Sequence, residues 1–380
     1  MTITEKILAR GSGKTRIQAG DVCFVRVDKV MMHDVSGPGV IKVLSEWEKR
    51  GIKMDHIWDP DRVWIAEDHF VPAADKVSAE NIMTLSRWTK KYGIKKHFKY
   101  GLGHTDIAYV LMNGQIWLKV PETILFEITG TKPDHVMAKD IILRIIGDIG
   151  TDAANYKAMQ FSGNIVKEMS MDERLTLTNM TTEAGAKNGI IEPDAVTESY
   201  LRERTNASYS PILGDTDAKF SEVLTYEIDK LEPSVARPFS PGNISAAREL
   251  QEIEIDKVYI GSCTGAKFED LQAVAKILKG RKVKVRTEIL PAAQSIYMKA
   301  VRDGLASIFL EAGVVIGPPT CGACCGAHMG VLAEDEICVS TTNRNFPGRM
   351  GHVKSRTYLA SPMVAAASAV RGKITDPRDI

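Results

Sequence analysis

Hydrophobic residues recur with the periods of strands and helices in alternation along the chain. Residues 20–32 alternate between apolar and polar side chains as in a strand, and residues 63–66 form an apolar run typical of a buried strand. Residues 40–49 and 77–93 instead repeat their apolar positions with helical spacing. Strands that alternate with helices favour a parallel sheet covered by helices, so the expected fold class is α/β.

The same alternation continues in the middle of the chain. Residues 122–130 are expected to form a strand, and residues 138–149 an amphipathic helix that a glycine ends. The proline- and glycine-containing stretch 236–242 is the best candidate for a linker between domains. We therefore expect a first α/β domain over residues 1–121 and a second over residues 122–235.

The alternation is strongest in the last third of the chain. The predicted strands and helices follow in the order 257–260, 268–278, 283–290, a helix through Tyr297 and Leu305, and 314–316. We expect these elements to form a third α/β domain over residues 236–380.

Composition and charge exclude several classes of protein. Hydrophobic residues make up 44% of the 380 residues and charged residues 26%, and the net charge of +1 gives no electrostatic argument for binding nucleic acid or an anionic membrane. No apolar run is long enough to cross a membrane, and the first residues lack the order of a secretory signal. Six cysteines in a chain of this length do not indicate a disulfide framework, and Cys23 and Cys338 are expected to be core residues of strands. We therefore expect a cytoplasmic protein.

Three cysteines lie in glycine-containing loops that directly follow predicted strands. Cys263 is the centre of Gly-Ser-Cys-Thr-Gly, and Cys321 and Cys324 belong to Pro-Thr-Cys-Gly-Ala-Cys. Three thiolates can hold three corners of a cubane iron–sulfur cluster and leave one iron open as a Lewis acid. The same thiols are also compatible with a buried core position or with a zinc site, for which Cys325 or His328 could supply a fourth ligand.

A loop with two arginines follows the cysteine pair. It reads Asn343-Arg344-Asn345-Phe346-Pro347-Gly348-Arg349. Guanidinium groups match carboxylates in a bidentate geometry, so two arginines five residues apart can converge on one dicarboxylate. This loop favours the iron–sulfur interpretation of the cysteines over the zinc interpretation.

The combined stretch from Cys321 to His352 resembles the large-subunit branch of the isopropylmalate isomerases in the aconitase superfamily. The resemblance runs along the whole chain apart from one gap. It implies an α/β fold of three domains around a central cleft and a [4Fe-4S] cluster bound by Cys263, Cys321 and Cys324. Cys325 is then a neighbour of a ligand.

The resemblance also implies an activity. The open iron would assist dehydration and rehydration of a hydroxy-dicarboxylate, and the expected reaction converts 2-isopropylmalate to 3-isopropylmalate in leucine biosynthesis. The alternatives are homocitrate, citramalate or dimethylmalate as the substrate, or an iron–sulfur sensor or binding protein without turnover. A fourth, swivelling domain that carries the serine base is absent from this chain, so we expect it on a separate small subunit.

Further site residues follow from the resemblance, position by position. Asp68 and His69 match a catalytic pair at the end of a strand, and His33 matches a position that binds substrate. Gln160 stands where most relatives have an active-site glutamate. The substrate-binding residues implied by the resemblance are His33, Gln160, Asn343, Arg344 and Arg349.

The chain departs from the family between Tyr100 and Gly101. Relatives carry a block of several dozen residues there, with a His-Gln pair and an Asp-Ser-His-Thr motif of the acid–base network. Either the protein lacks this block or the sequence omits a mobile loop. His104 aligns downstream of the block and receives no role.

Overall fold

The structure is a computed structural model that describes residues 1–98, 105–326 and 328–380. These residues form two compact units. The smaller unit is Ile7–Val120 with Thr320–Gly322, and the larger unit is Met1–Lys6, Pro121–Pro319 and Ala323–Ile380. Within the described ranges, no helix is both long and apolar enough to span a bilayer.

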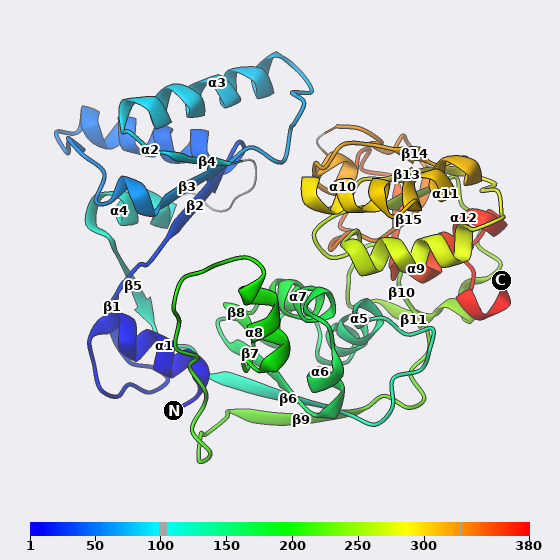
Figure 1. The fold of residues 1–380 in the computed structure, drawn as a ribbon, viewed down its shortest axis with the longest axis horizontal. Coiled ribbons are helices and arrows are strands. Elements are labelled where there is room, and N and C mark those ends of the chain that lie inside the picture. Colours follow the sequence, from blue (N-terminus) through cyan, green and yellow to red (C-terminus); the bar gives the residue numbers. More distant parts are fainter. Residues whose placement is uncertain (99–104, 327) are drawn as a thin grey trace. The chain divides into compact units, whose positions relative to one another are not determined.

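The smaller unit is built on a sheet of three strands in the order β2-β3-β4, and the strands run parallel, as the sequence predicts. Apolar residues of β2 and β3, such as Met32 and Ile65, are fully buried against Leu85 of helix α3. Helices α2, α3 and α4 lie beside this sheet (Figure 1). The elements are β2 (Val30–His33), α2 (Ser36–Lys49), β3 (Val63–Ala66), α3 (Lys76–Lys91), β4 (Lys96–Phe98) and α4 (Thr105–Asn113), with a 3-10 turn at Pro60–Arg62.

The segment 20–32 forms two strands, so the expectation of a single strand was wrong. β1 (Val22–Arg26) pairs antiparallel with β5 (Gln115–Lys119), whereas β2 belongs to the parallel sheet. Between them the Val27 amide donates to the Gly114 carbonyl (2.9 Å). The alternation predicted extended backbone correctly but carries no information about the change of partner strand. Helix α1 (Ile3–Ser12) precedes this ribbon.

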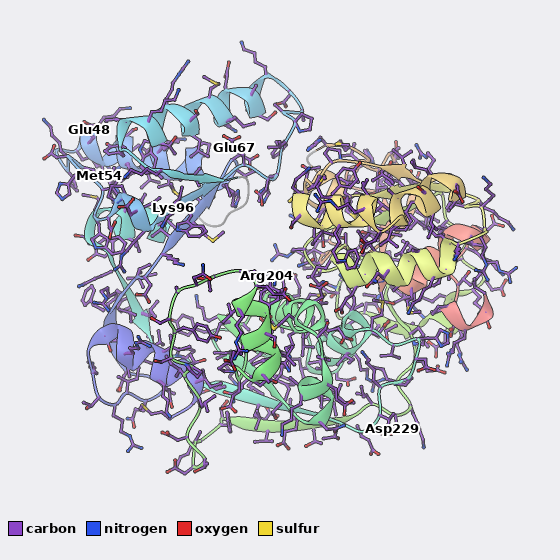
Figure 2. The ribbon with its side chains drawn as sticks, viewed as in Figure 1. Glu48, Met54, Glu67, Lys96, Arg204 and Asp229 are labelled. Atoms are coloured by element: carbon purple, nitrogen blue, oxygen red, sulfur yellow. The ribbon has the colours of Figure 1, made fainter. Side chains whose placement is uncertain are left out.

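The larger unit contains a four-stranded parallel sheet in the order β8-β7-β6-β9. Helix α5 follows the predicted residues 138–149 and buries Ile141, Ile142, Ile145 and Ile146 against it. Asp229, just after β9 (Figure 2), accepts a hydrogen bond from the Thr131 amide beyond β6 (3.1 Å). The elements are β6 (Thr123–Thr129), α5 (Ala138–Ile149), β7 (Ala158–Ser162), α6 (Asn164–Glu168), α7 (Met171–Asn179), η2 (Met180–Ala184), β8 (Asn188–Ile191), α8 (Ala195–Arg202) and β9 (Glu222–Glu227).

The second sheet of the larger unit has seven strands in the order β11-β10-β16-β15-β12-β13-β14. The five strands from β16 to β14 run parallel, and all four residues of β12 are buried, as is typical of a strand covered on both faces. The elements are β10 (Ser234–Ala236), β11 (Ile244–Ala246), η3 (Ala247–Leu250), β12 (Lys257–Ile260), α9 (Phe268–Leu278), β13 (Arg286–Ile289), α10 (Gln294–Arg302), α11 (Leu305–Ala312), β14 (Val315–Ile316), η4 (Gly322–Cys325), β15 (Ile337–Ser340), β16 (Arg356–Ala360), α12 (Pro362–Arg371) and η5 (Pro377–Asp379).

Two expectations for this region were wrong. The helix through Tyr297 and Leu305 is divided into α10 and α11, because Gly304 between them adopts a left-handed conformation (φ +78°). The expected linker 236–242 is the turn of the antiparallel hairpin β10–β11. The division of the chain into three domains stays a prediction.

An ion pair between a buried arginine and a partly exposed aspartate links three helices beside the four-stranded sheet. Arg174 of α7 is 3% exposed and donates to both carboxylate oxygens of Asp194 (2.7 and 2.6 Å) and to the carbonyls of Lys167 and Met169. Asp194 also caps α8, since its Oδ1 accepts from the Val196 amide (3.0 Å). The Arg174 hydrogen bonds lower the pKa of Asp194 to about 2.

The change Asp194→Asn should destabilise the protein. Asparagine keeps an oxygen for the cap but loses the charge that Arg174 requires, so we expect a loss on the order of 1–2 kcal/mol in urea unfolding. This value allows for screening, because more than a third of the Asp194 side chain is exposed. Since the pKa of Asp194 is lowered in the folded state, its contribution is present above about pH 4 and is lost as the pH falls toward 2.

The matched control is Glu198→Gln on the same helix. Glu198 pairs with Arg202 in the exposed i,i+4 arrangement, and such pairs contribute about 0.5 kcal/mol or less. Equal losses for the two variants would contradict a special role for the pair of Arg174 and Asp194.

Candidate functional site

The loop that carries Cys263 follows β12 and rests on the loop after β15. The Thr341 hydroxyl accepts from the Gly261 amide and donates to the Gly261 carbonyl (both 2.9 Å). A Cβ on Gly265 would lie 2.3 Å from the Cβ and Oγ1 of Thr341, so the close approach of the two loops requires glycine there. Because β12 and β15 are parallel neighbours, both loops leave the same edge of the seven-stranded sheet.

Side chains from three elements meet at Cys263. Its Sγ, in an exposed residue, accepts a hydrogen bond from Asn179 Nδ2 at the end of α7 (3.4 Å). Asn179 Oδ1 in turn accepts from Asn343 Nδ2 (2.8 Å), and Asn343 Oδ1 accepts from the hydroxyls of Ser262 and Thr264 (3.2 and 2.5 Å). The structure therefore brings Asn343 into the surroundings of Cys263.

Cys324 lies close enough to Cys263 for the two charges to interact. Burial, and after it the negative charge of Cys263, raise the pKa of Cys324 to about 11, and the charges of Arg349 and Lys139 oppose this shift. A thiol with a raised pKa is protonated at neutral pH and is deprotonated when it binds a metal. Two thiols from separate loops beside cationic groups are a donor set that suits an iron–sulfur cluster.

The two arginines of the predicted loop have different partners. Arg344 Nε donates to both carboxylate oxygens of Glu183 (2.8 Å each). Arg349 Nε is buried and has no hydrogen-bond partner among the described residues, and its charge acts on both Glu183 and Cys324. A buried guanidinium N–H without a partner fits a position that binds an anionic ligand.

Glu183 is a buried carboxyl group beside both arginines. Burial raises its pKa, and the hydrogen bond and charge of Arg344 oppose this effect. Asn345 fixes the same loop, because its Nδ2 donates to the carbonyls of Arg237 (2.8 Å) and Thr357 (3.1 Å). The backbone between Arg344 and Arg349 is thus held in place by the hydrogen bonds of Asn345.

The predicted residues of the smaller unit also meet. His33, Asp34, Asp68 and His69 have ligand atoms within 4.8 Å of one another, at the ends of β2 and β3. The rings of His33 and His69 stack at 3.9 Å between centroids, and His69 Nδ1 lies 2.6 Å from Asp68 Oδ1. Asp34 holds the loop after β3 by accepting from the amides of residues 68, 69 and 70.

Cys321 is part of this smaller unit. Its amide donates to the Asp68 carbonyl (3.2 Å), and the neighbouring Thr320 hydroxyl donates to the His69 carbonyl (2.9 Å). The stretch Thr320–Gly322 is therefore hydrogen-bonded to the loop that carries Asp68 and His69.

Gln160 lies in the middle of β7, between Leu125 of β6 and Ile190 of β8. It is 6% exposed, and its Oε1 has no hydrogen-bond partner among the described residues. No hydrogen bond recorded within those residues links its amide to the cysteines or the arginines. Its role in substrate binding stays a prediction. Cys23 and Cys338 are buried strand residues, as predicted, and the segment 99–104 around the expected gap lies outside the described residues.

Sequence reasoning missed three residues of the site in the larger unit. Asn179 and Glu183 lie four positions apart across α7 and η2, and Lys139 lies in the first turn of α5. The spacing of Asn179 and Glu183 places them on one helical face, which is a usable signal. Lys139 interrupts an otherwise apolar helix face, which is the signal of a buried charge.

Three comparisons give the relatives of this chain. The model of the "Aconitase family (aconitate hydratase)" matches residues 97–249 and 243–372. The 3-isopropylmalate dehydratase large subunit 1 of Methanopyrus kandleri is 41% identical over 418 positions, covering 99% of both chains. The corresponding large subunit 1 of Pyrococcus furiosus is 43% identical over 425 positions, covering 100% of this chain and 99% of that chain.

The lengths of these alignments exceed that of the chain. Since 418 positions exceed 380 residues by 38, at least that many positions of the first relative face a gap. A solved structure, aconitase X of Thermococcus kodakaraensis in its holo-form, has a TM-score of 0.47 and 12% identity over 93% of this chain and 97% of that chain. The family model and the full-length relatives establish the relationship: the chain belongs to the aconitase family.

Proposed function

We propose that the chain is the large subunit of a 3-isopropylmalate dehydratase, which isomerises 2-isopropylmalate to 3-isopropylmalate by dehydration and rehydration. The observation that carries this proposal is the full-length similarity, at 41–43% identity, to relatives that bear this name. The donor set around Cys263 and the two arginines support it independently, because they suit a cluster and an anionic substrate.

The cofactor of this reaction is a [4Fe-4S] cluster. Cys263 and Cys324 would hold it in the larger unit, and the resemblance of the motif Cys321–Cys324 to the family implies Cys321 as the third ligand. When bound, the cluster supplies an open iron that acts as a Lewis acid toward a hydroxyl group.

The arginines bind the substrate carboxylates. Arg349 offers an unsatisfied Nε–H, and no described residue accepts a hydrogen bond from the Nη atoms of Arg344. Glu183 sets the orientation of Arg344 through both carboxylate oxygens. Asn343 is held by Asn179 and Thr264, so the backbone before Arg344 is fixed before substrate binds.

Asp68 and His69 form a proton-transfer pair. The hydrogen bond from His69 Nδ1 to the Asp68 carboxylate selects the tautomer in which Nε2 can accept a proton. The stacked His33 ring is fixed because its Nδ1 accepts from the amides of Val35 and Ser36 (3.2 and 3.1 Å). This arrangement supports the roles inferred for His33, Asp68 and His69.

The partner is a small subunit that carries the swivelling domain and the serine base. The relatives' designation as large subunits supports such a partner. Homocitrate, citramalate and dimethylmalate present the same hydroxyl and carboxylate groups and are the alternative substrates.

A second candidate function is an iron–sulfur binding protein without turnover. The specific observation in its favour is the alignment gap of at least 38 positions, taken from 418 aligned positions and 380 residues. If that gap contains the acid–base block, the chain can bind the cluster and the substrate but transfers protons poorly. Turnover by the two-subunit complex distinguishes the two candidates.

Anaerobic reconstitution with iron and sulfide should give broad visible absorption and about four irons per chain. Replacing Cys263, Cys321 or Cys324 by Ser should abolish cluster binding, because each removes a ligand. The matched controls are Cys325→Ser and Cys338→Ser, which should keep the iron content. Stoichiometric zinc without sulfide would overturn the cofactor assignment.

The changes Arg344→Lys and Arg349→Lys should lower kcat/KM of the two-subunit enzyme. Lysine keeps the charge but loses the planar fork, and a lost charge-assisted pair costs about 1.5–3 kcal/mol, roughly a ten- to hundredfold fall. Iron content should be unchanged. Arg378→Lys is the control, since Arg378 pairs with Asp376 and lies outside the proposed site. Near-native kcat/KM in both site variants would show that the arginines serve folding or docking.

The isolated chain should show no turnover of 2-isopropylmalate, and activity should appear when its small subunit is added. The reason is that the serine base is expected on the partner. Robust turnover by the isolated chain would contradict this division of the catalytic groups. A complex that binds iron and substrate but does not turn over would favour the second candidate.

A further inference from the structure

We propose that Lys139 is a positioning residue that clamps the two loops of the larger unit's site and starts a one-way relay of hydrogen bonds ending at the Cys263 sulfur. The part of this inference that concerns the cluster rests on the proposed function. Neither the motifs nor the comparisons point to this residue.

Lys139 is a fully buried cation without a carboxylate partner. It is 1% exposed in the first turn of α5, and the partners of its Nζ among the described residues are a hydroxyl and two carbonyls rather than a carboxylate. Burial, and after it the neighbouring charge of Lys267, lower the pKa of Lys139 to about 7. The charges of Cys263, Asp270 and Cys324 act in the opposite direction. An unpaired buried ammonium is costly, so its retention calls for a function.

The three hydrogens of the ammonium are all used, and they join the two loops. Nζ donates to Thr264 Oγ1 (3.0 Å), next to Cys263, and to the carbonyls of Thr341 (2.6 Å) and Thr342 (2.7 Å), next to Asn343. An ammonium group has three donors and no acceptor, so these bonds satisfy it completely. Lys139 therefore fixes the spacing between the Cys263 loop and the loop that begins the arginine motif.

The relay continues from Thr264 to the sulfur. The Thr264 hydroxyl donates to Asn343 Oδ1 (2.5 Å), Asn343 Nδ2 donates to Asn179 Oδ1 (2.8 Å), and Asn179 Nδ2 donates to Cys263 Sγ (3.4 Å). When Lys139 is charged its ammonium can only donate, as its bond to Thr264 Oγ1 shows, so the Thr264 hydroxyl receives at its oxygen and donates onward, and each amide is oriented in the same sense. Every bond then points its positive end toward Cys263.

Such a chain has two consequences. Bonds that point the same way polarise one another, so the charge of Lys139 is felt at the sulfur more strongly than a single neutral bond would allow. Hydrogen bonds to ligand sulfurs and nearby positive charge raise the reduction potential of iron–sulfur clusters. Lys139 should thus hold the potential of the cluster above the value that the thiolates alone would give.

The relay is tested with the pair Thr264→Val and Thr264→Ser in the reconstituted chain. Valine keeps the shape of threonine but removes the hydroxyl, so the midpoint potential in a spectroscopic redox titration should become more negative. Serine restores the hydroxyl and should restore the potential. Equal potentials for the Val and Ser variants would overturn the relay. Thr89→Val is a control, since Thr89 is a buried threonine of the smaller unit whose hydroxyl donates to backbone carbonyls alone.

The clamp is tested with Lys139→Met in the metal-free chain. Methionine is unbranched and apolar, so the core contacts of the stem are kept while the three bonds are lost. Hydrogen exchange should become faster over residues 261–265 and 341–344 and stay unchanged in β6. Unchanged exchange in both loops would overturn the clamp. If the Lys139→Met variant does not fold, the comparison of Thr264→Val with Thr264→Ser decides the inference. If the native chain binds no cluster, the proposed function is refuted, and the hydrogen-exchange result still decides whether Lys139 clamps the two loops.

Discussion

The arrangement of the candidate site depends on the close contact between the loops after β12 and β15. Parallel neighbouring strands deliver both loops to one edge of the sheet, and Gly265 allows them to approach until Thr341 bonds the backbone of Gly261. Lys139 of α5 joins the two loops, because its Nζ donates a hydrogen bond to each of them. One loop carries the Cys263 thiol and the other carries two arginines, so this contact sets the distance between the proposed metal ligand and the groups proposed to bind the substrate carboxylates.

The charged groups around this contact act on one another. Lys139 and Arg349 act on the thiol of Cys324, and Arg344 is neutralised by Glu183. Burial disfavours the charged forms of Cys324, Glu183 and Lys139, so the pKa of Cys324 and of Glu183 is raised and that of Lys139 is lowered. Binding a cationic metal to the thiols, and an anionic ligand to Arg349, would satisfy groups that are incompletely paired in the protein alone.

Much of this fold is predictable from the sequence, because the apolar periods of α5, α9 and β12 are local. The predicted residues 138–149, 268–278 and 257–260 are the observed elements. The wrong predictions concern segments whose structure depends on distant partner strands. Residues 20–32 pair first with β5 and then with β3, and residues 236–242 form the turn of a hairpin. The cysteines and arginines were recognisable from their motifs, whereas Asn179, Glu183 and Lys139 become site residues only when α7 and α5 pack beside the seven-stranded sheet. The helical spacing of Asn179 and Glu183 and the charge of Lys139 in an apolar helix are local signals, but they do not identify the elements against which these residues pack.

Mössbauer spectroscopy of the chain reconstituted with iron-57 tests the central claim most directly. If three cysteines hold a cubane cluster, the spectrum should contain a four-iron cluster in which one iron differs in its ligands from the other three. Replacing any one of the three cysteines should remove this pattern. A mononuclear iron signal, or a cluster with four equivalent thiolate-bound irons, would contradict the account.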